Sequence, residues 1–298
     1  MALPKKLLAL SVSAVAGISL LVGGGTYALF NSTAQNTGNT FQSGSLVISQ
    51  NRDDVPITGP MFYTNDFDAA SNGGAMGTGL WQPTDSHTRA MFIHDDGTVD
   101  AKMVSLTATP EGTTNDQANA VEFANQAHLT VTVLEPNNPG DADARAYDKA
   151  VQDLDKYYRE TWHDNYLNRL VTLTGIPKDV LSTQIEFYTQ KYSAETRKQV
   201  SLQAIADTKA MLINRVFGGY DASLTVRDIY DAPMSDMVNT TYTLPAANQF
   251  EVKVNHPLYV GYTVTLLDEG TQNNVLQGKN VKFTFSSTFQ QDNNNPNQ

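Results

Sequence analysis

The 298-residue sequence contains no cysteine. Disulfide bonds, thiol catalysis and cysteine-ligated zinc are therefore all excluded, although small exported proteins commonly rely on disulfides for stability. The chain must be held together by a hydrophobic core or by assembly. Its 40% hydrophobic residues are sufficient for a core of substantial size.

Basic residues are also scarce. The 20 Lys and Arg residues stand against 31 Asp and Glu residues, which gives a formal net charge of −11. Removal of Lys5 and Lys6 with a leader leaves 18 basic residues against the same 31 acidic ones, and hence a charge of −13. Nucleic acids and anionic lipids both bind to cationic surfaces. The sequence therefore predicts no nucleic-acid partner and no membrane partner for the mature chain.

Long apolar runs are absent after residue 22. The one such run, residues 7–22, follows Lys5 and Lys6 and leads to the small residues Thr26 and Ala28. This order is typical of a secretory signal peptide over residues 1–28, with cleavage before Leu29. The alternative is a retained membrane anchor, but the run is shorter than the ~20 residues that span a bilayer. We therefore expect a secreted extracellular protein.

Three stretches of the chain form a recognisable set. The first is Gly-Gly-Gly-Thr-Tyr-Ala-Leu-Phe-Asn at 23–31 with Phe-x-x-Gly-x-Leu at 41–46; the second is Trp-Gln-Pro-Thr-Asp-Ser at 81–86 with residues 92–102; the third is 272–278 with 281–290. Together they resemble the TasA/camelysin family of secreted bacterial proteins. Thr84 stands where that family usually has Gly, and Asp95-Asp96 replaces an Asn-containing turn. No motif of the family aligns with residues 141–220.

The resemblance implies cleavage just before the Phe30-Asn31 pair and a first strand formed by the motif at 41–46. It leaves two functions open: a structural subunit of an extracellular fibre or biofilm matrix, and a secreted camelysin-like metallopeptidase. We favour the fibre, which makes other copies of the chain the main partner and places the protein in the extracellular matrix or at the cell surface. A minor fibre-associated or anchoring protein is a second candidate partner.

The rest of the chain predicts a mainly β fold, a two-sheet jelly-roll-like sandwich with an inserted helical module. Alternating apolar residues predict strands within residues 40–140 and 220–290, and the Gly- and Pro-rich residues 55–79 a long surface loop. The turn at Asp95-Asp96-Gly97 predicts a hairpin between its two flanking strands. We expect the Asn-rich tail, 291–298, to be disordered.

Residues 141–219 change to a helical pattern. Aromatic and aliphatic residues recur every three or four positions from Tyr147 to Leu170, which predicts one long amphipathic helix ended by Gly175. A second helix is predicted over about 178–192. Ser193 is a plausible N-cap for a third helix that ends at Gly218-Gly219.

The predicted mature N-terminus, residues 29–39, has an apolar pair at its start and is polar beyond it. One interpretation is a frayed chain end. The other is an arm that adds itself as a donor strand to the sheet of a neighbouring subunit. The residues we assign to this polymerisation arm are Leu29, Phe30, Asn31, Ser32, Thr33, Ala34 and Gln35.

Residues that carry chemistry are few, and the sequence predicts no catalytic residue and no cofactor. Neither a His-Glu-x-x-His motif nor a Gly-x-Ser-x-Gly motif occurs, and the chain has five histidines. Weak metal candidates are Glu160 and His163, which share a helix face, and Asp141 and Asp143, whose oxygen ligands suit calcium. The acidic pairs at 53–54 and 95–96 are further weak candidates for calcium. We interpret all of them as solvated groups, turns or caps, so that no metal site is predicted.

Overall fold

The computed structural model describes residues 32–33, 46–51, 62–63, 81–136, 154–212, 224–256, 258–279 and 281–292. The predicted signal peptide, most of the N-terminal arm, the acidic residues 53–54 and 141–143, the start of the first helix, the end of the third helix and residues 293–298 of the tail lie outside these residues. Gln291, which the sequence analysis placed in the disordered tail, instead belongs to a strand. Within the described ranges, no helix has the length and apolarity needed to cross a membrane.

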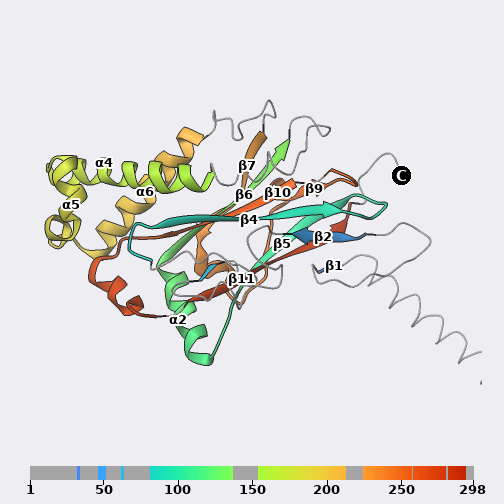
Figure 1. The fold of residues 1–298 in the computed structure, drawn as a ribbon, viewed down its shortest axis with the longest axis horizontal. Coiled ribbons are helices and arrows are strands. Elements are labelled where there is room, and N and C mark those ends of the chain that lie inside the picture. The colour runs from blue at the N-terminus through green and yellow to red at the C-terminus, as the bar shows by residue number, and fades with distance from the viewer. Residues whose placement is uncertain are drawn as a thin grey trace, which may run out of the picture.

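The strands form two antiparallel sheets (Figure 1). In the first sheet the order is β1-β11-β5-β8, with β3 also on β11 and β9 also on β5; in the second it is β2-β4-β10-β6-β7. The strands are β1 Ser32–Thr33, β2 Ile48–Asn51, β3 Phe62–Tyr63, β4 Ser86–Asp95, β5 Ala101–Pro110, β6 Ala127–Pro136, β7 Leu224–Pro233, β8 Tyr242–Thr243, β9 Phe250–Val252, β10 Leu258–Leu266 and β11 Lys282–Gln291. A mainly β fold is thus confirmed, whereas jelly-roll connectivity stays a prediction.

The main core lies between the two sheets. Alternate residues of β11 and β5 enter it from one side, and alternate residues of β10 and β4 enter it from the other, as the period of two in the sequence predicts. Fully buried examples are Met103, Phe283 and Phe289 from the first sheet, and Ile93 and Tyr262 from the second. Burial of each such side chain stabilises the fold by about 1.5–3 kcal/mol.

The predicted hairpin around Asp95-Asp96-Gly97 is wrong. β4 pairs with β2 and β10 in the second sheet, whereas β5 pairs with β11, β8 and β9 in the first. The turn therefore carries the chain from one sheet to the other. Ile93 and Met103 are both buried in the core between the sheets, so core burial rather than turn chemistry decides where each strand pairs. Similarly, the loop predicted over 55–79 contains β3, which pairs with β11.

Helix α2, Thr114–Asn125, was not predicted from the sequence. Its N-terminus carries a capping box in which the Thr113 side chain accepts from the Asp116 backbone and Asp116 accepts from the Thr113 backbone. Ala120 and Phe123 pack into the main core. The Thr-x-x-Asp spacing was the signal that could have identified this helix.

Between β6 and β7, the helix boundaries that fall within the described residues lie near the predicted positions. They are a π-helical turn η2, Tyr158–Trp162, followed by α4 His163–Thr174, α5 Lys178–Thr189 and α6 Ala194–Leu212. Gly175 ends α4 in the left-handed conformation, with φ 73°, and Ser193 Oγ accepts from the Thr196 backbone at 3.2 Å. Both predicted caps are therefore confirmed. The described residues 154–212 are called the helical segment below.

The helical segment packs on the outer face of the second sheet. All nine residues of β10 are buried, although only alternate ones face the main core. Leu154 lies 3.6 Å from the position that a Cβ would take at Gly261, and the Asp155 carboxylate accepts from the Thr88 backbone at 2.6 Å. Figure 1 shows α4 and α6 beside the ends of the sheet, with α5 farthest from it. The helices thus shield a sheet face that would otherwise be open to solvent.

Candidate functional site

The first candidate site is the outer edge of β11. Along its inner edge, β11 pairs with β5 from Phe283 to Gln291. Along the other edge, Ser32 and Thr33 of β1 pair with Phe289 and Thr288, and the two residues of β3 pair with 282 and 283. These two short pairings are separated by residues 284–287. Two residues of the predicted polymerisation arm thus lie on this edge.

The backbone of β11 is held firmly from the inside. Phe283, Phe285, Ser287 and Phe289 point into the core, and Tyr262 Oη and Ser287 Oγ lie within hydrogen-bonding distance at 3.2 Å. Because these side chains fix the strand, its outer edge presents backbone groups in a defined register. Such an edge is a template to which a further strand can add.

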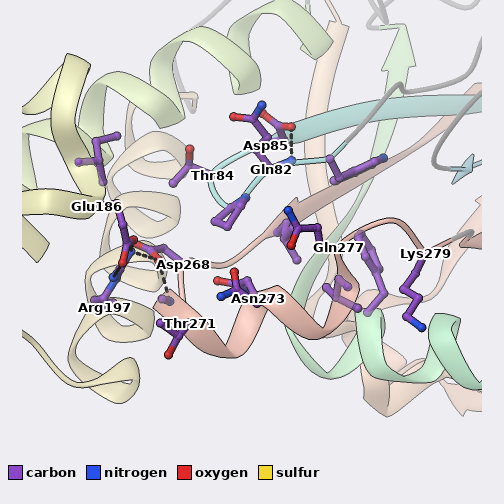
Figure 2. A pocket seen from close by; sticks show the side chains of 18 of the residues that line it. Gln82, Thr84, Asp85, Glu186, Arg197, Asp268, Thr271, Asn273, Gln277 and Lys279 are labelled. Carbon is purple, nitrogen blue, oxygen red and sulfur yellow. Dashed lines mark hydrogen bonds and ion pairs between the residues drawn. The ribbon is translucent and has the colours of Figure 1, made fainter. Parts of the chain in front are cut away.

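The second candidate site is a cleft of about 920 Å³ between the sandwich and the helical segment (Figure 2). One wall is the turn at 81–85; another is the 3₁₀ helix η5, Gly270–Leu276, with the residues that follow it; a third is α5, through Ile185 and Glu186. Most residues of the two internal stretches that carry the family resemblance, 81–86 and 272–278, therefore line this cleft. Sequence reasoning did not predict it.

An ion cluster closes the helical end of the cleft. The guanidinium of Arg197 donates to both carboxylate oxygens of Glu186, at 3.2 and 2.7 Å, and its Nε donates to Asp268 Oδ2 at 3.0 Å. Tyr166 Oη also donates to Asp268. Burial, together with the negative charge of Asp268, raises the pKa of Tyr166, so its hydroxyl stays protonated and remains a donor. One guanidinium thus contacts two carboxylates, so this cluster carries one excess negative charge.

The turn at 81–85 contains a residue in an unfavourable backbone conformation. Thr84 has φ 86°, in the left-handed region that favours Gly. The turn is nevertheless fixed, because Asp85 N donates to Gln82 O at 2.9 Å and Thr84 N donates to Leu266 O at 2.9 Å. The departure noted in the sequence, Thr in place of Gly, therefore occurs at a position whose geometry suits Gly.

Aromatic residues form the opposite end of the cleft. The Trp81 ring packs edge-on against Phe123 at 5.2 Å and against His87 at 4.7 Å between centroids. Leu276 and Val281 add aliphatic surface. Burial lowers the pKa of His87 to about 4, so this ring is neutral near pH 7. The cleft thus combines an apolar end with a polar end.

Residues 2–58 match the model of a family described as camelysin metallo-endopeptidase. This match supports the TasA/camelysin family. It covers the N-terminal stretch and leaves the helical segment and the cleft outside the matched residues. Among curated proteins, a search finds no match to the chain.

The name of the matching family implies a metal ion. Glu160 and His163 are the candidate ligands for it from the sequence. Glu160 is exposed, whereas His163 is partly buried at the start of α4 and lines the cleft. Burial lowers the pKa of His163, and the nearby charges of Asp164 and Asp85 oppose this. Among the described residues, no three His, Asp or Glu side chains are placed to hold a metal ion. These residues therefore do not fit a metallopeptidase centre, while Asp141 and Asp143 lie outside them.

The acidic pair at 95–96 is part of the turn between the sheets. Asp95 is fully buried, and its Oδ1 accepts from the Gly97 backbone at 2.8 Å. Burial, together with the charges of Asp100 and Asp96, raises the pKa of Asp95 to about 6. Asp96 pairs with His94 at 2.5 Å. The contacts of Asp95 and Asp96 are thus those of turn residues, as the sequence analysis interpreted them.

Proposed function

We propose that the chain is a structural subunit of an extracellular fibre, which polymerises by donating its N-terminal arm, residues 29–39, to the sheet of the next subunit. The observation that carries this proposal is the pairing of Ser32 and Thr33 with the outer edge of β11. The family match over residues 2–58 does not distinguish this function from the peptidase considered below. In this view the protein is secreted, and its mature form begins at Leu29 or Phe30.

The physical basis is an exchange of equivalent contacts. An arm that leaves its own β11 and pairs with the β11 of a neighbour forms the same backbone hydrogen bonds, so the exchange loses little pairing energy and links two subunits. Phe30 supplies an apolar anchor at the start of the arm. Because arm and edge are different surfaces, the contact is heterologous and need not close, which yields an open filament.

The decisive experiment removes the arm. Secreted mature protein, identified by N-terminal sequencing, is compared with a form that lacks residues 29–39, using electron microscopy and size-exclusion chromatography. We expect the shortened form to be a folded monomer that forms no filaments. Phe30→Asp should weaken assembly, whereas Phe187→Asp, at a 63%-exposed position on α5, should leave it unchanged. Normal filaments from the shortened form would refute strand donation by this arm.

The second candidate function is that of a camelysin-like metallopeptidase, which the name of the matching family favours. The two functions differ in their response to metal. A fibre subunit forms filaments that withstand a chelator and leaves casein intact. A metallopeptidase cleaves casein, loses this activity in EDTA and regains it when zinc is added. Casein cleavage with that metal dependence would favour the second function.

A further inference from the structure

The cleft between the sandwich and the helical segment has a suitable size for a ligand. Its volume, about 920 Å³, falls within the roughly 300–1,000 Å³ that small-molecule sites occupy. The polymerisation proposal, which concerns the edge of β11, assigns no role to this cleft. Two stretches that are far apart in the sequence, 81–85 and 273–279, come together to form it.

Several hydrogen-bonding side chains that line the cleft are not used by the protein itself. In the part of the chain that the structure describes, the side chains of Gln82, Thr84, Asn274 and Gln277 make no hydrogen bond to another residue. All four are neutral. Figure 2 shows Gln277 between η5 and the turn that carries Gln82 and Thr84. These four side chains therefore contribute amides and a hydroxyl to the free hydrogen-bonding capacity of the cleft.

The charged groups of the cleft are already engaged. Arg197 is paired with Glu186 and Asp268, and the latter pair has a nitrogen–oxygen distance of 2.7 Å. Asp85 accepts from the Gln82 backbone at 2.6 Å, and burial raises its pKa. A charged ligand would have to compete with these internal contacts. A neutral ligand with several hydroxyl or amide groups can bind without breaking them.

The apolar end of the cleft further limits the chemical class of ligand that can bind. Rings of Trp81 and Phe123, with Leu276 and Val281, offer surface for an apolar face of the ligand. A pyranose ring has such a face on its C–H side and hydroxyl groups around its rim. Peptides, in contrast, are commonly bound through their backbone along an open strand edge. Here the strand ends are paired with each other, because Leu266 N donates to Asp85 O at 2.9 Å.

We propose that this cleft is a binding site for a short neutral oligosaccharide. Trp81 and its apolar neighbours contact the C–H faces of the sugar rings. The side chains of Gln82, Asn274 and Gln277 bind the hydroxyl groups. The ligand lies between the sandwich and the helical segment, and no charge on it is required.

The test uses the full mature chain. It is first applied to an array of neutral glycans, including oligomers of glucose, galactose and N-acetylglucosamine, together with anionic glycans. The neutral glycan with the highest affinity is then titrated into the protein and its binding is measured by calorimetry. Gln277→Ala and Asn274→Ala each remove a hydrogen-bonding group from an exposed position, and each should weaken binding about fivefold or more. Gln272→Ala changes an exposed residue of the same helix that does not line the cleft and should leave affinity unchanged.

Thermal melting of each variant verifies that it is folded, and Gln82→Ala on the opposite wall provides a second variant. Loss of affinity in the cleft variants, with normal binding by Gln272→Ala, supports the proposal. The proposal is overturned if no neutral glycan binds, if anionic glycans alone bind, or if all variants bind equally. Displacement of the glycan by a neutral Asn- and Gln-rich decapeptide with higher affinity would assign the cleft to peptides instead.

Discussion

Arg197 and Asp268 form a two-point ion pair at the junction between the helical segment and the sandwich. Arg197 Nε and Nη2 lie 3.0 and 2.7 Å from the two carboxylate oxygens of Asp268, and their side chains are 5% and 1% exposed. Gly270 N also donates to Asp268 Oδ1 at 3.0 Å. The pair therefore joins α6 directly to the chain that leaves β10.

Replacing Arg197 by Met should strongly reduce stability. The variant leaves the buried carboxylate of Asp268 without its cation, and the loss of one partner of a buried pair typically costs about 3–5 kcal/mol. Chemical denaturation at pH 7 measures the change. The matched control is Arg169→Met, because Arg169 pairs with Asp207 at a position that is 40% exposed. An exposed pair contributes about 0–1 kcal/mol, so equal losses in the two variants would contradict the assigned role of Arg197.

Replacing Thr84 by Gly should stabilise the protein by about 1 kcal/mol. The left-handed φ of 86° costs a β-branched residue about 1–3 kcal/mol, and the greater freedom of Gly in the unfolded chain offsets part of this gain. Thr84→Ala keeps a Cβ at the same φ and should give little or no stabilisation. Differential scanning calorimetry distinguishes the two. If Ala stabilises as much as Gly, the backbone conformation is not the cause.

Asp95 should make stability fall as the pH rises. Burial raises its pKa in the folded state from the ordinary 3.8 to about 6, so the folded chain binds more protons than the unfolded chain between these values. Its favourable contribution is full below pH 3.8 and is lost as the pH rises through 6. Asp95→Asn removes the titrating group, so this loss of stability is absent from the variant. Between pH 4 and 7, the free energy of unfolding of the variant should therefore rise by on the order of 3 kcal/mol relative to that of the parent protein.

Denaturant unfolding at a series of pH values measures this difference. Asp236→Asn, at an exposed carboxylate, is the control and should track the parent protein closely. A constant difference between Asp95→Asn and the parent from pH 4 to 7 would contradict the raised pKa.

Replacing residues 141–219 with a Gly/Ser linker should retain strands but lower stability. The replacement removes Leu154 and Asp155 and exposes the outer face of β10, which includes Thr263, 1% exposed in the structure. Circular dichroism should still show β structure, whereas melting should occur at a lower temperature and be accompanied by self-association. Unchanged melting would show that the helical segment is peripheral to the sheet.

Local patterns predicted the elements better than their partners. The period of two identified β6, β10 and β11, and the caps at Gly175 and Ser193 identified helix ends, because these signals depend on neighbouring residues. The pairing of β4 with β10 rather than with β5 depends on burial in a shared core, which no single stretch encodes. Helix α2 was missed because its residues lack a strong apolar stripe, although its capping box was visible.

The candidate sites show the same difference between local patterns, which the sequence reveals, and contacts that form only in the folded chain. The arm was predicted from its polar composition, and its described residues Ser32 and Thr33 do lie on a sheet edge, while the rest of the arm remains a prediction. The cleft could not be predicted, because its walls come from segments that meet only in the folded chain. The ion pair of Arg197 with Asp268 likewise joins residues from different elements, and neither is part of a local motif.

The direct pairing of β6 with β7 has a consequence for the order of folding. These strands are neighbours in the sheet, but the chain between them runs from residue 137 to residue 223. Closing a long flexible loop carries an entropic cost that slows the pairing of its ends. Helices form from local contacts on a much shorter timescale. Helix formation between these strands shortens the chain that must be closed, so we expect the helical segment to acquire its structure before the second sheet is complete.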